Sequence, residues 1–149
     1  MSLPRSESSP NTVEIRSVLL LDDDVELVET LKMLLETQNF VVTTVTNGVD
    51  GLHEVMAFDF DAIICDLMMP SMPGDMFYLA VQRTKPYLCE RFIFITGHAN
   101  NPKFTGFLAQ SKGRALYKPV KSEELLEAIR SVLNRNPDNA GGPVGSTAR

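Results

Sequence analysis

Short apolar runs alternate with amphipathic helical stripes along most of this chain, and this alternation limits the accessible folds more than any other feature. The runs are rich in aliphatic, β-branched or aromatic residues, have the length of buried strands, and occupy 17–21, 40–45, 61–65, 91–95 and 114–117. Apolar residues at helical spacing fill the intervals, most clearly along 27–35 and 125–133 and more weakly along 49–56, 75–85 and 101–110. The pattern therefore predicts five strands, each followed by a helix.

An alternating series of strands and helices predicts an α/β fold, in which a mostly parallel sheet is covered by helices on both faces. Right-handed crossovers restrict the topology, and the common doubly wound order for a five-stranded sheet is 2-1-3-4-5. We therefore expect a single flavodoxin-like (βα)5 domain over residues 15–134. Residues 1–14 are expected to form a flexible leader, and residues 135–149 a disordered tail.

The charge, the apolar runs and the cysteine content exclude several classes of protein. A formal net charge of −5 argues against binding to nucleic acid or to an anionic membrane. The longest apolar runs have strand length, so they are too short to cross a bilayer, and the first residues lack the apolar core of a signal peptide. Cys65 and Cys89 have no metal-type spacing, which favours free thiols in a reduced compartment. These features predict a cytoplasmic protein.

Polar side chains stand where four of the predicted strands end. Asp22 and Asp23 follow the first strand, and Asp66 follows the third. Thr96 ends the fourth strand, and Lys118 ends the fifth. In a doubly wound sheet, ligands bind outside the carboxyl ends of the strands, at the switch point between strands one and three. We therefore expect these side chains to converge on one crevice.

Three carboxylates in one crevice need compensating positive charge. At contact distances and an effective dielectric of about 20, they would repel one another by several kcal/mol. Lys118 supplies one ammonium group, and a hard divalent cation with oxygen ligands, Mg²⁺, would supply the rest. Asp66 would be the nucleophile, because a carboxylate needs no general base, while Thr96 and Lys118 would hold phosphoryl oxygens. The set predicts a site of magnesium-dependent phosphoryl transfer.

Four motifs, "LLLDDD", "IICDLMMPSMPG", "FITGH" and "YKPV", together resemble the receiver domain of bacterial response regulators in two-component signalling. The resemblance runs from about residue 16 to 134. It implies that Asp66 accepts a phosphoryl group from a histidine kinase or a histidine phosphotransferase. Such a protein is a phosphoacceptor that catalyses its own phosphorylation and dephosphorylation, and it is not an enzyme in the ordinary sense.

The resemblance also implies the roles of the surrounding residues. The metal site would consist of Asp22, Asp23, Asp66 and the backbone carbonyl of Met68, with Asp22 acting mainly through water. Thr96 and Lys118 would bind the phosphoryl oxygens, and the peptide bond between Lys118 and Pro119 would be cis. The output would pass to a downstream protein partner.

Two positions depart from the usual family pattern. Ala115 stands three residues before Lys118, where the family often has an aromatic residue that swings inward on activation. Tyr117 lies two residues later on the same side of the strand. The way in which phosphorylation is detected can therefore differ from the family pattern. Detection is expected at the face formed by the fourth helix, fifth strand and fifth helix, which is also a candidate homodimer face. Pro73 replaces the acidic residue often found before the glycine of the loop, a change expected to be benign.

Two other functions fit parts of the pattern. A magnesium-dependent phosphatase of the haloacid dehalogenase type would use Asp22 as nucleophile, with Asp24 completing a D-x-D motif. That family usually has Thr or Val where this chain has Glu26, and no paired acidic motif appears late in the chain. A receiver that binds partners without phosphorylation is less favoured, because every reactive position is filled. For Asp24 alone, a helix cap is the preferred interpretation.

Overall fold

The computed structural model describes residues 16–97 and 101–135. The strands are β1 (Arg16–Leu21), β2 (Phe40–Val45), β3 (Ala62–Asp66), β4 (Phe92–Thr96) and β5 (Arg114–Tyr117). The helices are α1 (Val25–Thr37), α2 (Gly48–Ala57), α3 (Gly74–Thr84), α4 (Pro102–Gln110) and α5 (Ser122–Arg135), with a 3-10 helix, η2 (Pro86–Arg91), between α3 and β4. Each strand is followed by an α-helix, as predicted.

The strands form one parallel sheet in the order β2-β1-β3-β4-β5, which confirms the predicted topology. β1 lies between β2 and β3, and its last residue, Leu21, pairs with Val45 on one side and with Cys65 on the other. After β1 the chain adds β2 on one side of it, and it then adds β3, β4 and β5 on the other side. The connections after β1 and β3 therefore lead to opposite faces of the sheet, and the loops after these two strands diverge. This divergence creates the crevice in which a doubly wound fold binds its ligands.

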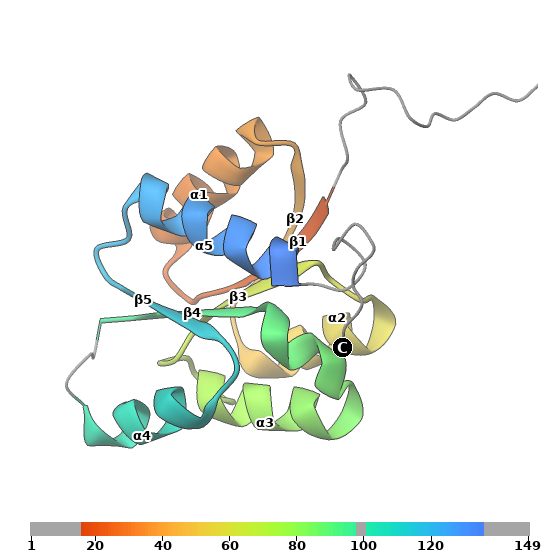
Figure 1. Ribbon diagram of the computed structural model, residues 1–149, viewed down its shortest axis with the longest axis vertical. Coiled ribbons are helices and arrows are strands. Elements are labelled where there is room, and N and C mark those ends of the chain that lie inside the picture. The colour runs from red at the N-terminus through yellow and green to blue at the C-terminus, as the bar shows by residue number, and fades with distance from the viewer. Residues whose placement is uncertain (1–15, 98–100, 136–149) are drawn as a thin grey trace, which may run out of the picture.

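The sheet is the middle of three layers (Figure 1). Helices α1 and α5 cover one face, and α2, α3 and α4 cover the other. Alternate residues of one strand supply the two cores: Val18 and Leu20 face α1 and α5, whereas Leu19 and Leu21 pack with α2 and α3. Because both faces are covered, the central strands are apolar along their whole length rather than at every second residue.

Side-chain caps start three helices close to the strand ends. The Asp24 Oδ1 atom accepts a hydrogen bond from the Leu27 amide at 3.2 Å, which confirms the predicted cap of α1. Asn47 Oδ1 accepts from the Asp50 amide at 2.8 Å at the start of α2, and Asn101 Oδ1 accepts from the Lys103 amide at 3.0 Å at the start of α4. These caps satisfy amide groups that the first turn of a helix leaves without a partner.

Three strands differ from the sequence prediction by one residue at their boundaries, and the first of them, β1, begins one residue earlier, at Arg16. The third strand begins one residue later than predicted and ends at Asp66, which pairs with Ile95 of β4, so this aspartate belongs to the strand. Asp61 lies just before the strand, and its Oδ2 atom accepts a hydrogen bond from the Ser17 amide at 2.8 Å. The fourth strand also begins one residue later, since the buried Arg91 ends η2. Helix η2 itself was not predicted.

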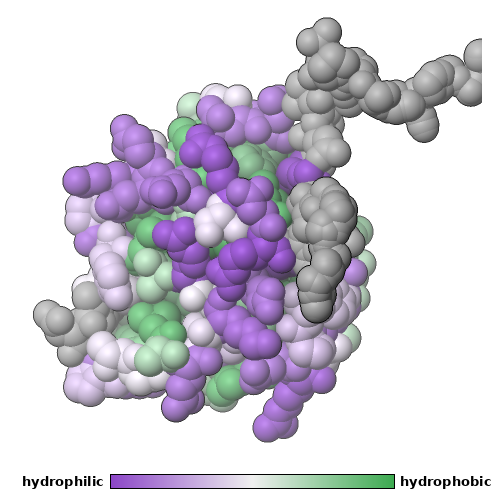
Figure 2. All heavy atoms as spheres, in the orientation of Figure 1, coloured by the Kyte–Doolittle hydropathy of each residue, from purple (hydrophilic) through white to green (hydrophobic). Residues whose placement is uncertain are grey.

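None of the helices in residues 16–97 and 101–135 is long and apolar enough to cross a membrane. The predicted leader lies outside the described residues, as does the predicted tail apart from Arg135, the last residue of α5. Hydrophilic residues cover most of the face that α5 presents (Figure 2).

Candidate functional site

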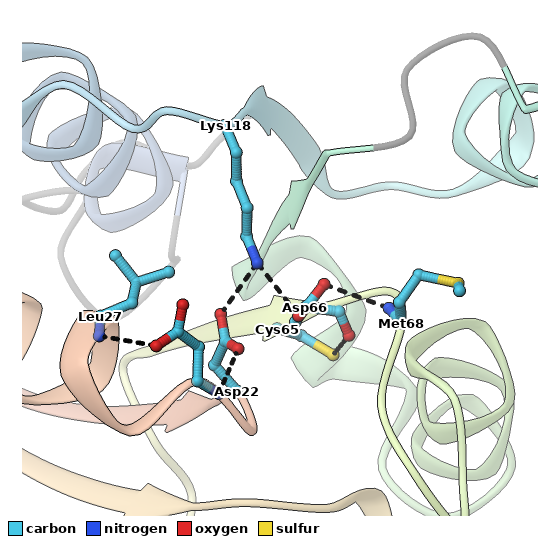
Figure 3. Close-up of polar contacts among 7 residues, drawn as sticks. Asp22, Leu27, Cys65, Asp66, Met68 and Lys118 are labelled. Atoms are coloured by element: carbon cyan, nitrogen blue, oxygen red, sulfur yellow. Dashed lines mark hydrogen bonds and ion pairs between the residues drawn. The ribbon is translucent and has the colours of Figure 1, made fainter.

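Four strand ends meet at the carboxyl edge of the sheet. Asp22 directly follows β1, Asp66 ends β3, Thr96 ends β4 and Lys118 directly follows β5. The side chains of Asp22, Asp66 and Lys118 point toward one another (Figure 3). The topology explains this arrangement, because β1 and β3 are neighbours and their residues leave the sheet side by side.

Asp22, Asp23 and Asp66 form a compact acidic cluster. One carboxylate oxygen from each residue lies within 4.8 Å of the others. Asp22 and Asp66 are buried, with exposed fractions of 1% and 4%, whereas Asp23 is exposed. Two carboxylates thus form the floor of the site and a third stands at its rim, open to water. Such a set of oxygen ligands suits a hard divalent cation that keeps part of its hydration shell.

Lys118 lies across the cluster. Its Nζ atom donates a hydrogen bond to Asp66 Oδ2 at 3.2 Å and lies 3.5 Å from Asp22 Oδ2. Burial disfavours the charged ammonium, but the attraction of Asp66 and then of Asp22 outweighs burial, so the pKa of Lys118 is raised. The lysine therefore stays charged and offsets part of the repulsion between the two buried carboxylates.

The surroundings of Asp22 disfavour its charged form. Burial raises its pKa to about 6, and the negative charge of Asp66 adds to that effect. The amide of Asp24, which donates to Asp22 Oδ1 at 3.0 Å, and the charge of Lys118 act in the opposite direction. Among the described residues, the buried Asp22 Oδ2 atom accepts no hydrogen bond of ordinary geometry, and its contact with the Lys118 ammonium is an ion pair at 3.5 Å. A buried carboxylate oxygen without a hydrogen bond of ordinary geometry is a position where a bound cation fits.

The loop after β3 holds Asp66 from its other side. Asp66 Oδ1 accepts from the Met68 amide at 3.1 Å, and the Asp66 carbonyl accepts from the Cys65 thiol at 3.3 Å. The chain then returns at Gly74, where a Cβ atom would lie 2.4 Å from the Asp66 carbonyl oxygen. Only glycine permits this close approach. Gly74 was not among the predicted site residues, although the pair Pro73-Gly74 after the aspartate is a recognisable turn signal.

Thr96 and Lys118 are linked through the backbone. Thr96 is fully buried, and its carbonyl accepts a hydrogen bond from the Lys118 amide at 2.9 Å. Thr96 also pairs in register with Tyr117, so β4 and β5 deliver the hydroxyl and the ammonium group to the same end of the sheet. The peptide bond between Lys118 and Pro119 is cis, as the resemblance implied.

The surface beside Ala115 is hollow. A cavity of about 430 Å³ lies against β5, and Ala115, Tyr117, Pro119 and Glu124 contribute to its lining. Tyr117 is 47% exposed at this surface. The small side chain at position 115 thus leaves space on the outer side of β5.

Of the two histidines, His53 lies exposed on α2, while His98 falls outside the described residues.

The comparisons with known proteins decide which family this arrangement represents. The sequence model of the response regulator receiver domain matches residues 18–130. The chain belongs to the response regulator receiver domain family. It is 29% identical over 119 residues to the transcriptional regulatory protein GlrR of Escherichia coli (strain K12), covering 80% of this chain and 26% of GlrR. It is 31% identical over 120 residues to the response regulator ArlR of Staphylococcus aureus (strain Mu50 / ATCC 700699), covering 80% of this chain and 53% of ArlR.

Solved receiver domains share the fold. The receiver domain of the sensor histidine kinase PA1611 from Pseudomonas aeruginosa PAO1 superimposes with a TM-score of 0.70 at 21% identity, covering 83% of this chain and 98% of that one. That structure holds a magnesium ion coordinated in its active site cleft. The receiver domain described here spans between a quarter and about half of the length of GlrR and ArlR. Nothing in these comparisons supports the haloacid dehalogenase alternative.

Proposed function

We propose that this receiver domain, over residues 15–134, is switched by transfer of a phosphoryl group to Asp66. The observation that carries the proposal is that one aspartate, at the end of β3, is shared by both parts of the site. Its ligand oxygen belongs to the acidic cluster with Asp22 and Asp23, and its Oδ2 atom binds the ammonium of Lys118. A phosphoryl group on Asp66 would therefore meet a cation site and a lysine at once.

Magnesium is the proposed cofactor. It would be held by Asp22, Asp23, Asp66 and the backbone carbonyl of Met68. The clustering of three carboxylate oxygens supports this assignment, as does the buried Oδ2 atom of Asp22, which has only the ion pair with Lys118 among the described residues. The magnesium ion in the cleft of the PA1611 receiver domain supports it further. When bound, Mg²⁺ would supply positive charge that lets carboxylate and phosphoryl oxygens approach each other.

Asp66, Lys118 and Thr96 would each perform one part of the phosphoryl transfer. A carboxylate oxygen of Asp66 bonds to phosphorus while the phosphorus–nitrogen bond of a phosphohistidine breaks, and the electron pair remains on the histidine nitrogen. The Lys118 ammonium follows the negative charge as it spreads over the equatorial oxygens, and the Thr96 hydroxyl donates a hydrogen bond to one of them. Hydrolysis of the acyl phosphate would return the switch to its resting state.

The partners follow from this role. A histidine kinase or histidine phosphotransferase would supply the phosphoryl group, and a downstream protein partner would receive the signal in the cytoplasm. The face formed by α4, β5 and α5 is the proposed output surface and a candidate homodimer face. The cavity beside Ala115 supports a mode of detection that does not depend on an aromatic residue at that position. No nucleic acid or membrane partner is proposed.

Acetyl phosphate labelling tests this function. With Mg²⁺, intact-mass spectrometry should show the addition of a single phosphoryl group, and peptide mapping should assign it to Asp66. The Asp66→Asn variant should take up no label, Asp22→Asn should label more slowly, and chelation of the metal should abolish labelling. Asp61→Asn is the matched control, because Asp61 binds the Ser17 amide at the opposite edge of the sheet. A label on Asp22 would contradict the proposal and favour the phosphatase mechanism.

A further inference from the structure

Helix α3 is apolar on both of its sides. Phe77, Tyr78 and Val81 are buried and pack into the core between α3 and the sheet. On the opposite side, Met76 is 57% exposed and Leu79 is 47% exposed. A helix that covers a sheet normally presents polar residues to water, so this outer stripe requires an explanation.

The outer stripe lines a groove. Met72, Met76, Leu79, Ala80 and Arg83 surround a hollow of about 320 Å³. The spacing of three and four residues from Met76 through Leu79 to Arg83 keeps these three residues on one side of the helix, and Met72 extends the groove from the loop before α3. The helix lies along the lower edge of the molecule in Figure 1, and apolar residues interrupt the hydrophilic surface at that edge in Figure 2.

Charges stand at both ends of the stripe, with opposite signs. Asp75 lies in the first turn of α3 and Arg83 in the last turn. If two copies of α3 pack antiparallel and cross at Leu79, Asp75 of each copy lies level with Arg83 of the other, because both residues are four positions from the crossing point. The interface would then have an apolar centre between two reciprocal ion pairs, which a two-fold axis generates from one patch.

We infer that the groove along α3 is the docking surface for a second copy of this chain, joined through antiparallel α3 helices. Methionine suits such a surface, because its flexible and polarisable side chain adapts to an irregular partner. A single helix on each side buries a small area, so the dimer is weak and forms in the micromolar range or above. The net charge of −5 opposes association at low ionic strength, and salt screens this repulsion.

The surface is separate from the phosphoryl-transfer site and from the proposed output face. No residue that lines the groove belongs to the acidic cluster, to β5 or to α5. The inference therefore does not depend on phosphorylation of Asp66, and the unphosphorylated chain is sufficient to test it.

Analytical ultracentrifugation of the full chain over a concentration series is the test. The unmodified protein should show a reversible monomer–dimer equilibrium. Leu79→Glu and Met76→Glu should each weaken the dimer by about 10-fold or more, because a charge would be buried in the apolar centre. Both side chains are about half exposed in the monomer, so the fold is retained, and circular dichroism verifies this. Met33→Glu on α1 is the matched control, since Met33 is 68% exposed and lies on the opposite face of the sheet.

A charge-swap cycle tests the antiparallel geometry. Arg83→Asp should weaken the dimer, and the double variant Asp75→Arg with Arg83→Asp should restore it, because the swapped charges again face each other. A chain that remains monomeric at every concentration overturns the inference. So does a dimer that persists in Leu79→Glu and dissociates in Tyr117→Glu, since that result assigns association to the face of α4, β5 and α5.

Discussion

At the scale of single residues, Asp22 links the electrostatics of the site to the stability of the fold. Its carboxyl is buried, and its pKa of about 6 in the folded protein lies above the ordinary value of 3.8. The folded state therefore binds more protons than the unfolded state between these two values. The stability that this proton provides is fully present below about pH 4 and is lost as the pH rises through 6. The metal-free protein thus carries unfavourable negative charge at neutral pH.

We expect Asp22→Asn to stabilise the metal-free protein at pH 7. The amide removes the buried charge with little change of shape, so the free energy of unfolding should rise by on the order of 2 kcal/mol. The gain should shrink as the pH falls toward 5, because the unmodified carboxyl is then largely protonated. Thermal unfolding in the presence of a chelator, followed by circular dichroism at several pH values, measures both effects.

The difference in stability between the unmodified protein and Asp22→Asn reports the titration of Asp22, because the two proteins share their other titrating groups. Asp59 has a pKa lowered mainly by its hydrogen bond with Lys85, so it titrates below 3.8 and in the opposite sense, and both proteins retain it. Magnesium should reverse the order of stability, because it binds the carboxylate and not the amide. Equal thermal midpoints for the two metal-free proteins at pH 7 would show that the buried charge of Asp22 does not destabilise the fold.

At the scale of secondary-structure elements, the loop from β3 to α3 determines the position of Asp66. We expect Gly74→Ala to lower the thermal midpoint strongly and to reduce acetyl phosphate labelling. The added Cβ would lie 2.4 Å from the Asp66 carbonyl oxygen and 2.9 Å from the Leu67 Cα, and backbone atoms cannot rotate away. The loss of stability should reach on the order of 2 kcal/mol or more.

Gly106→Ala is the matched control for that substitution. Gly106 lies in α4, and a Cβ atom there would meet nothing within 4 Å. Replacing an exposed helical glycine by alanine should stabilise the protein by roughly 0.5 to 1 kcal/mol. If Gly106→Ala and Gly74→Ala had similar effects on stability and labelling, the loop would not position Asp66 as described.

The start of η2 is held by a polar cluster at the opposite edge of the sheet. Lys85 Nζ donates to the Val55 carbonyl and to Asp59 Oδ1, both at 2.8 Å, and the Tyr87 hydroxyl donates to the same Asp59 oxygen at 2.9 Å. We expect Lys85→Met to lower the free energy of unfolding by about 1 kcal/mol, since Asp59 is half exposed and water partly replaces the lysine. Urea denaturation measures the change.

Lys32→Met separates this effect from the general loss of a lysine. Within the described residues, Lys32 pairs with Glu36 at 3.6 Å on the exposed side of α1, so its removal should change stability by less than about 0.5 kcal/mol. A Lys85→Met variant as stable as Lys32→Met would show that the cluster contributes nothing to folding.

The same elements show how far the sequence predicts the structure. The periods of the apolar residues predict the strands to within a residue or two, because burial on both faces of a parallel sheet leaves little choice of residue type. Helix η2 was missed because its six residues are too few to show a period, and Pro86 is typical of loops as well. The acidic cluster could be predicted from topology, whereas the surroundings of the buried Asp22 Oδ2 atom depend on atomic positions that no residue pattern encodes.

At the scale of the whole molecule, the helices differ in how many of their side chains are buried against the sheet. Phe104 is the buried residue of α4, whereas Leu125, Ala128, Ile129 and Val132 are buried in α5. A cavity of about 90 Å³ also separates α4 from α3 near Phe107. Little apolar area therefore stabilises α4, and it belongs to the part of the fold that opens at low free energy.

We expect the backbone amides of 102–110 to exchange with deuterium at least about 10-fold faster than those of 122–135, because local opening of α4 exposes little apolar surface. Hydrogen exchange followed by mass spectrometry, without phosphate donor, measures this difference. Adding acetyl phosphate and Mg²⁺ should change protection in α4 and β5 more than in α2, since Thr96 pairs with Tyr117 of β5 and α4 is the next helix along the chain. Exchange of α5 before α4 would contradict the low local stability of α4. A response to acetyl phosphate confined to α2 would mean that phosphorylation acts on this receiver through a different element.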